Sequence, residues 1–137
     1  TVQAQILSLL GTLRERRGMS VLLISHDLGA VAGITDRVAV MYAGRLVEIG
    51  PAEAVYAAPR HPYTAALLAC CARADRPRAD RLPAIPGAPP DPRLPLAGCA
   101  FAPRCPRALP ACAERPPLEG HRHLAACHNP VPGREAA

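Results

Sequence analysis

Four cysteines stand near the end of the chain, and their thiols are the groups with the most obvious chemical potential. They are Cys99, Cys105, Cys112 and Cys127, separated by five, six and fourteen residues. Zinc sites usually take their cysteines from CxxC pairs, which this set lacks. A four-thiolate iron–sulfur cluster accepts irregular spacing and a proline beside a ligand, as Pro106 is here. The set therefore favours a cluster over zinc, while a disulfide and unmodified thiols stay open.

A second group of polar residues, Ser25-His26-Asp27, directly follows an apolar run. Ligands of open α/β sheets bind beyond the carboxyl ends of the strands. A histidine at that place can donate a hydrogen bond to a phosphate or orient an attacking water. The plainer alternative is that His26 begins a loop, and the residue types alone favour that alternative.

The other titratable or reactive side chains have structural interpretations. Three histidines flank Cys127 and could replace a thiol as a ligand, but we expect them to be solvated. They are His121, His123 and His128. The remaining candidates are expected at the surface or in helix packing. They are the surface carboxylates Glu48 and Glu53, the helix-start residue His61, and the packing residues Cys70 and Cys71.

Composition limits the possible classes of protein. The 137 residues include no Trp, one Phe and three Tyr, so a dense core is not expected from large side chains. The net charge of +5 is the balance of sixteen arginines, the only basic residues besides histidine, and eleven acidic residues. No basic run is interleaved with aromatic residues, which argues against nucleic-acid binding. No signal peptide or membrane-spanning run is evident, which indicates a cytosolic setting in which thiols stay reduced. The start at Thr1, inside a predicted helix, suggests a piece of a longer protein.

The proline-free stretch 1–50 should contain the regular structure that positions His26. Apolar residues recur at helical spacing within residues 1–18, which predicts a helix there. The continuous apolar run in Ser20–Ser25 predicts a strand buried on both faces, as in a parallel sheet. Asp27 then has the side chain of a helix N-cap. This order of elements indicates the α/β class.

A hairpin and two short helices are predicted next. The strands are Arg37–Tyr42 and Arg45–Ile49, joined by an Ala-Gly turn. Pro51 and Pro62 suit the first turns of two short helices. Fourteen of the seventeen prolines fall in residues 77–132, so this part should be mostly irregular.

The motifs of the first half resemble the end of an ABC transporter ATPase domain. "TVQAQIL" is similar to the helix after the D-loop, "LLISHDL" to the switch strand, and "DRVAVMYAGRLVEIGP" to the last strands. The resemblance implies an α/β fold, the C-terminal remnant of a P-loop (RecA-like) domain. It implies that His26 is the switch histidine, which contacts the γ-phosphate of ATP across a dimer interface.

The second half resembles a subfamily, the oligopeptide, dipeptide and nickel importers. "PAEAVYAAPRHPYTAALL" and "GCAFAPRCPRALPAC" carry this resemblance. It implies an ATPase part in residues 1–58 and a Pro/Cys-rich extension in 59–137. Some members of the subfamily bind a [4Fe–4S] cluster through cysteines at places that match Cys99, Cys105, Cys112 and Cys127.

The resemblance also implies a setting and partners. The intact subunit would use ATP and Mg²⁺, pair with a second ATPase subunit, and sit beneath transmembrane permeases at the cytoplasmic face of the inner membrane. The chain departs from the family pattern because it has no GxxxxGK[ST] loop, no lysine, and no Walker B, Q-loop or signature motif. Alone it is therefore expected to be inactive. The alternatives are a freestanding metal-binding or interaction module, and a truncated product without activity.

Overall fold

The computed structural model describes residues 2–71 and 84–133. The chain forms two compact units, residues 1–36 and 37–137, which are described separately below. No helix in the described ranges is long and apolar enough to cross a membrane. The division after residue 58, between a predicted ATPase part and a predicted Pro/Cys-rich extension, stays a prediction.

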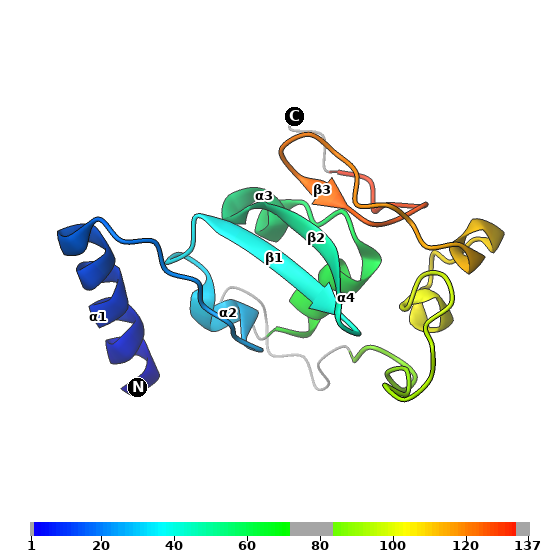
Figure 1. Ribbon diagram of the computed structural model, residues 1–137, viewed down its shortest axis with the longest axis horizontal. Coiled ribbons are helices and arrows are strands. Elements are labelled where there is room, and N and C mark those ends of the chain that lie inside the picture. The colour runs from blue at the N-terminus through cyan, green and yellow to red at the C-terminus, as the bar shows by residue number, and fades with distance from the viewer. Residues whose placement is uncertain (1, 72–83, 134–137) are drawn as a thin grey trace. The chain divides into compact units, whose positions relative to one another are not determined.

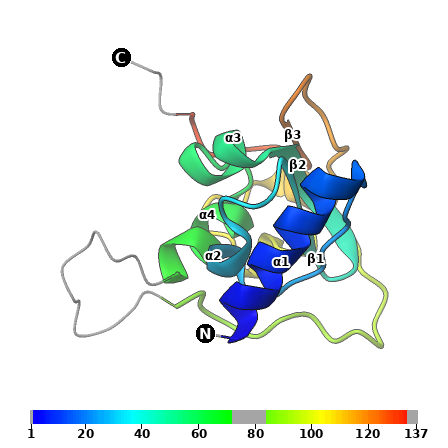
Figure 2. The ribbon, with the colours of Figure 1, turned by 90° about the vertical axis from the view of Figure 1, so that its left-hand side faces the viewer.

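The first unit contains the long helix α1 (Val2–Arg17) and the short helix α2 (Leu28–Val31) (Figure 2). The predicted N-terminal helix is thus confirmed. Gly18 follows it with a φ of 60°, a left-handed conformation that suits glycine at the end of a helix. The Asp27 side chain accepts a hydrogen bond from the Ala30 amide at 3.1 Å, so the predicted N-cap is also confirmed.

The strand predicted for Ser20–Ser25 is wrong. These residues form no strand, and the side chains of Leu22 and Ile24 are 91% and 90% exposed. A strand buried on both faces needs neighbouring strands to complete its hydrogen bonds and helices to cover its faces. The described part of the first unit offers no such strand. The apolar run therefore satisfies neither requirement and stays irregular and largely exposed.

The second unit is built on an antiparallel sheet of order β1-β2-β3 (Figure 1). The strands are β1 (Arg37–Tyr42), β2 (Arg45–Pro51) and the two-residue β3 (Leu124–Ala125). The predicted hairpin is confirmed, and its turn residues Ala43 and Gly44 have φ values of 48° and 75°. Two left-handed residues form the turn type whose twist matches the flanking strands. This small helix-and-sheet unit is consistent with the predicted α/β class.

Two helices and an aromatic cluster complete the core of this unit. The helices α3 (Ala52–Ala57) and α4 (Pro62–Cys70) follow β2, and Figure 1 shows α3 beside the hairpin. Phe101 is 1% exposed and lies edge-on to Tyr42 and Tyr63, with ring centroids 5.3 and 5.4 Å away. Because few large side chains are available, this one cluster supplies much of the apolar burial.

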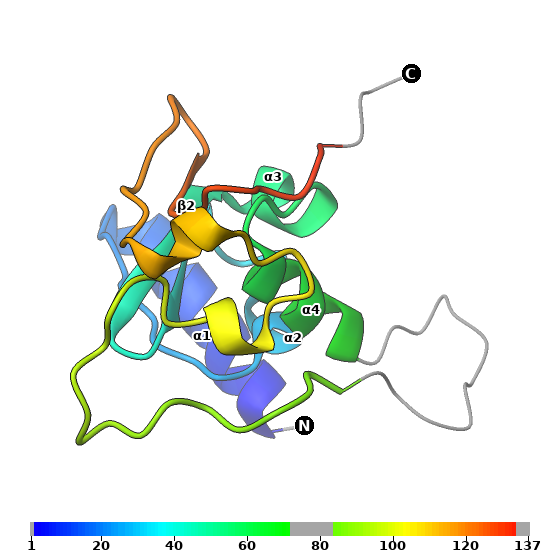
Figure 3. The same ribbon diagram turned by 90° about the vertical axis from the view of Figure 1, so that its right-hand side faces the viewer.

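The described residues after α4 consist largely of turns. Two short 3₁₀ helices, η1 (Ala102–Arg104) and η2 (Pro110–Ala113), occur in this region (Figure 3). The Arg104 guanidinium donates to the carbonyls of Ile85 and Pro86 at 3.0 and 2.8 Å, and to the Tyr42 hydroxyl at 3.2 Å. One arginine thus fastens residues 85–86 of the proline-rich part to the hairpin.

Candidate functional site

Three of the four candidate cysteines lie on the turns that contain η1 and η2. The Cys99 amide donates to the Cys112 carbonyl at 2.9 Å, which closes the loop between them. Gly98 has a φ of 62°, and a Cβ built on it would lie 2.4 Å from that same carbonyl oxygen. Only glycine allows the chain to pass so close. The four cysteines are free thiols.

Backbone N–H groups point at the sulfur atoms. The Arg107 amide donates to Cys105 Sγ and the Leu109 amide to Cys112 Sγ, each at 3.4 Å. Burial raises the pKa of the Cys105 thiol, and the neighbouring thiols of Cys99 and Cys112 act in the same direction. Clustered thiols with N–H donors suit soft metals, which require the thiols to lose their protons on binding.

Cys127 reaches this group from a separate segment. Burial raises its pKa too, and the thiols of Cys105, Cys99 and Cys112 add to the rise, so the four sulfurs are electrostatic neighbours. Asn129, two residues after Cys127, forms reciprocal hydrogen bonds with Arg107. Arg107 Nη2 donates to Asn129 Oδ1 at 2.9 Å, and Asn129 Nδ2 donates to the Arg107 carbonyl at 3.0 Å. In the described residues, however, no three His, Cys, Asp or Glu side chains are placed so that they could hold a metal ion.

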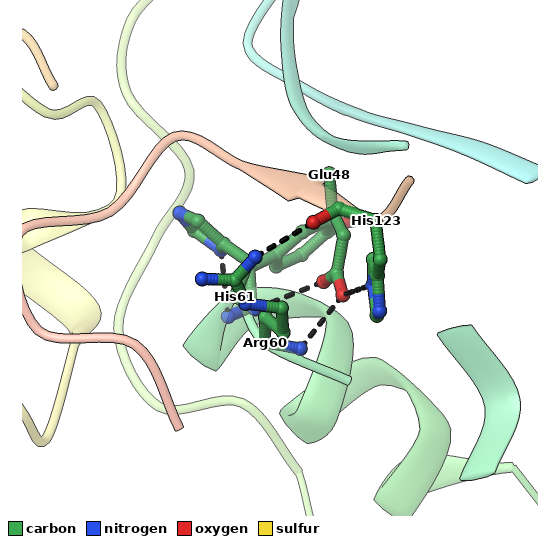
Figure 4. A network of polar contacts seen from close by, with 5 residues as sticks. Glu48, Arg60, His61 and His123 are labelled. Carbon is green, nitrogen blue, oxygen red and sulfur yellow. Dashed lines mark hydrogen bonds and ion pairs between the residues drawn. The ribbon is translucent and has the colours of Figure 1, made fainter. Parts of the chain in front are cut away.

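The interpretation of Glu48 as a surface carboxylate is wrong. Glu48 on β2 is 0% exposed, and its carboxylate accepts three hydrogen bonds (Figure 4). The donors are the amides of Arg60 and His61, at 2.7 and 2.9 Å, and His123 Nε2 at 2.6 Å. A buried carboxylate is tolerable only with such partners. Glu48 therefore joins β2, the loop before α4 and the C-terminal segment.

The expectation that His123 is solvated is also wrong. Its side chain is only 16% exposed because it is bound to Glu48 and lies over Gly50. A Cβ on Gly50 would lie 2.8 Å from His123 Cδ2, so the ring fills the space that a side chain would occupy. Arg60 Nη1 donates to the His123 carbonyl at 2.6 Å. We call Glu48, Gly50 and Arg60 the His123 socket.

His61 begins α4, as predicted, and is buried beside the socket. Its Nδ1 accepts from the Tyr63 amide at 3.1 Å, and its exposed fraction is 1%. Burial lowers the pKa of His61 to about 4, although the nearby Glu48 charge partly opposes the shift. His61 Nε2 and Thr64 Oγ1 are buried without a hydrogen-bond partner. The neutral ring thus serves as a packed N-cap.

His26 lies in the first unit, on the exposed loop before α2. Beside it, the Asp27 amide donates to Ser25 Oγ at 3.0 Å, which folds the loop into a tight bend. The imidazole is therefore presented at the surface, where a phosphate could reach it. Its predicted role in contacting ATP stays a prediction.

Comparisons with known proteins match a family model to the second unit and curated relatives to most of the chain. The family model described as "Oligopeptide/dipeptide transporter, C-terminal region" matches residues 47–112, which include most of β2, both α3 and α4, and three of the four candidate cysteines. Similar proteins include a probable peptide ABC transporter ATP-binding protein of Sinorhizobium fredii, 48% identical over 93% of this chain and 39% of the relative.

Two further relatives have comparable similarity. The oligopeptide transport ATP-binding protein OppD of Salmonella typhimurium is 49% identical over 96% of this chain and 39% of its own length. A putative peptide import ATP-binding protein of Brucella abortus is 50% identical over 86% of this chain and 35% of its own length. The chain thus spans well under half of these curated relatives. Over most of its length the chain is therefore similar to peptide ABC transporter ATP-binding proteins, and its residues 47–112 match the C-terminal region of oligopeptide/dipeptide transporters.

Proposed function

We propose that this chain is part of the ATP-hydrolysing subunit that powers import of peptides by an ABC transporter. The similarity to peptide transport ATP-binding proteins over most of the chain is the observation that carries the proposal. Nickel, the other cargo that the sequence motifs allow, has no support in the names of these three relatives. The intact subunit would bind ATP and Mg²⁺ and work beneath permease subunits, at the cytoplasmic face of the membrane, paired with a second ATPase subunit.

His26 is the residue of this chain proposed to act on ATP. In this role its imidazole would donate to the γ-phosphate as charge develops there, while other parts of the intact subunit hold the nucleotide and Mg²⁺. Its exposed position on a tight loop supports this role, because a phosphate could approach it without rearrangement of a core.

The test replaces His26 by Ala in the intact subunit. We expect ATP turnover to fall by about two to three orders of magnitude, the usual cost of losing one electrostatic donor to the transition state. ATP binding, measured with a fluorescent nucleotide analogue, should change little. The matched control is His128→Ala, an exposed histidine of the C-terminal segment. Normal turnover in the His26→Ala subunit would refute the assigned role.

We further propose that Cys99, Cys105, Cys112 and Cys127 hold an iron–sulfur cluster. Support comes from the donor set, which is all thiol, from the effect of the other three thiols in raising the pKa of Cys127, and from the N–H donors at Cys105 and Cys112. Binding would require the sulfur atoms to close on a common centre and lose their protons. Such a cluster would supply either structural cross-linking of the turns or redox chemistry.

Absorption and metal content test this second proposal. Protein purified without oxygen should be brown, with broad absorption near 400 nm and about four iron atoms per chain if the cluster is [4Fe–4S]. Replacing Cys105 by Ser should remove the colour, whereas Cys70→Ser should not. A colourless protein with one zinc per chain would instead support zinc, and a metal-free protein would refute the cluster.

A further inference from the structure

The C-terminal segment that carries Cys127 is held against β2 by backbone pairing. Glu48 and Ile49 pair with Ala125 and Leu124, and the Ala126 amide donates to the Val47 carbonyl at 2.8 Å. β3 has only two residues, so this pairing is short. Strand pairing of this length is weak unless side chains reinforce it. The position of Cys127, the next residue, depends on whatever supplies that reinforcement.

The His123 socket supplies side-chain contacts at the right place. His123 immediately precedes β3, and its ring is bound by the Glu48 carboxylate, while its carbonyl is bound by Arg60. Arg60 also accepts, through its own carbonyl, a hydrogen bond from the Val131 amide at 2.8 Å. The socket therefore touches the segment on both sides of Cys127.

We propose that the His123 socket positions Cys127, docking the C-terminal segment on β2 and so completing the group of four thiols. Cys99, Cys105 and Cys112 share one set of turns and need no such device, whereas Cys127 joins them only while its segment is docked. The Arg107–Asn129 contacts hold the far side of Cys127 but do not suffice alone. The consequence for a bound cluster rests on the proposed function, but the docking itself does not.

The test perturbs the socket without touching a cysteine. Gly50→Ala places a methyl group where the His123 ring lies and should expel it, while leaving Glu48 and Arg60 intact. His123→Gln removes the ring and serves as the second variant. Gly133→Ala is the matched control, because a Cβ at Gly133 meets nothing within 4 Å. Retention of the aromatic cluster, followed by near-ultraviolet circular dichroism, shows that each variant is folded.

Two measurements on the full chain, kept reduced and free of metal, then report on docking. Hydrogen exchange of the residue 126 amide should speed up by about tenfold or more in both variants, since losing some 1.4 kcal/mol of docking changes the open population tenfold. Labelling of Cys127 by N-ethylmaleimide should rise by a similar factor relative to Cys99. Tryptic peptides separate the two thiols, because Cys127 is the only cysteine in residues 123–134 and Cys99 the only one in 94–104.

The outcomes distinguish the socket from the cluster. Exchange and Cys127 labelling at wild-type rates in both folded variants would overturn the proposal. Faster exchange with an unchanged ratio of Cys127 to Cys99 labelling would also overturn it, because the Arg107–Asn129 contacts would then position the thiol. If the variants behave as expected but wild-type protein takes up no iron or zinc, the socket stands and the cluster proposal fails.

Discussion

Replacing Glu48 by Gln should destabilise the second unit more than any other isosteric change of a carboxylate in the described chain. The Glu48 side chain is fully buried and accepts hydrogen bonds from the Arg60 and His61 amides and from His123. Glutamine keeps one acceptor oxygen but turns an NH₂ group toward a donor. At least one buried N–H is then left without an acceptor, and His123 loses its charged partner.

The expected magnitude follows from these contacts. A hydrogen bond to a charged group contributes about 1.5–3 kcal/mol, and removing one member of a buried pair typically costs about 3–5 kcal/mol. Since glutamine preserves the shape and one acceptor, we expect a loss of about 3 kcal/mol. That is a large share of the ~5–15 kcal/mol by which domains are stable. With a urea m-value of about 1–3 kcal/mol/M, the unfolding midpoint should fall by roughly 1–3 M.

Tyrosine emission is the suitable probe. All three tyrosines, Tyr42, Tyr56 and Tyr63, lie in residues 37–137 and none in the first unit, so their emission reports on the second unit alone. Glu114→Gln, at an exposed position of the same unit, is the matched control and should change stability by less than about 0.5 kcal/mol. A Glu48→Gln loss as small as that of the control would refute the idea that the carboxylate joins the three segments.

Three other changes test separate parts of the structure. The pKa of His61 lies below its unfolded value, so the unfolded state binds the extra proton, and stability should rise by up to ~3 kcal/mol between pH 4 and 6.5. His61→Asn keeps an N-cap acceptor and should flatten this rise in urea titrations; an unchanged slope would contradict the assignment. Gly98→Ala should cost about 1–3 kcal/mol in urea unfolding through its positive φ and its clash with a carbonyl, whereas Gly133→Ala should be neutral. Ala43→Asn should raise the thermal midpoint by a few degrees, because asparagine tolerates the left-handed conformation better; a lower midpoint would argue against that turn geometry.

The parts of the fold that local sequence determines were predictable. The first hairpin strand alternates in burial, and the Ala43-Gly44 turn brings the two strands together without help from distant residues. The helix of residues 2–17 and the caps at Asp27 and His61 follow equally local rules. The strand predicted for residues 20–25 failed because its apolar run needs partners that local sequence cannot supply.

The socket could not be predicted from spacing, because Glu48 and His123 are 75 positions apart in the chain. Strict alternation along β2 would put Glu48 on the same face as the exposed Leu46, which suggests a solvated carboxylate. The β2 register shifts opposite Val40 and Met41, so the alternation breaks and Glu48 turns inward. One signal was available, since a glycine inside a strand pattern often marks a place where another part of the chain comes close. Gly50 occupies such a place under the His123 ring.

The residues next to two of the cysteines pack against the hairpin or form hydrogen bonds with it. Phe101, two residues after Cys99, fills the core against Tyr42 of β1, and the Ala126 amide, just before Cys127, binds the Val47 carbonyl of β2. Two of the four thiols are thus each within two residues of a contact with a different strand. A change that draws the sulfurs together, such as metal binding, must either preserve those contacts or strain both strands. The chemistry of the thiols and the stability of the hairpin are therefore linked. A ligand that binds the thiols more tightly when the hairpin is folded stabilises the hairpin by that difference in binding free energy.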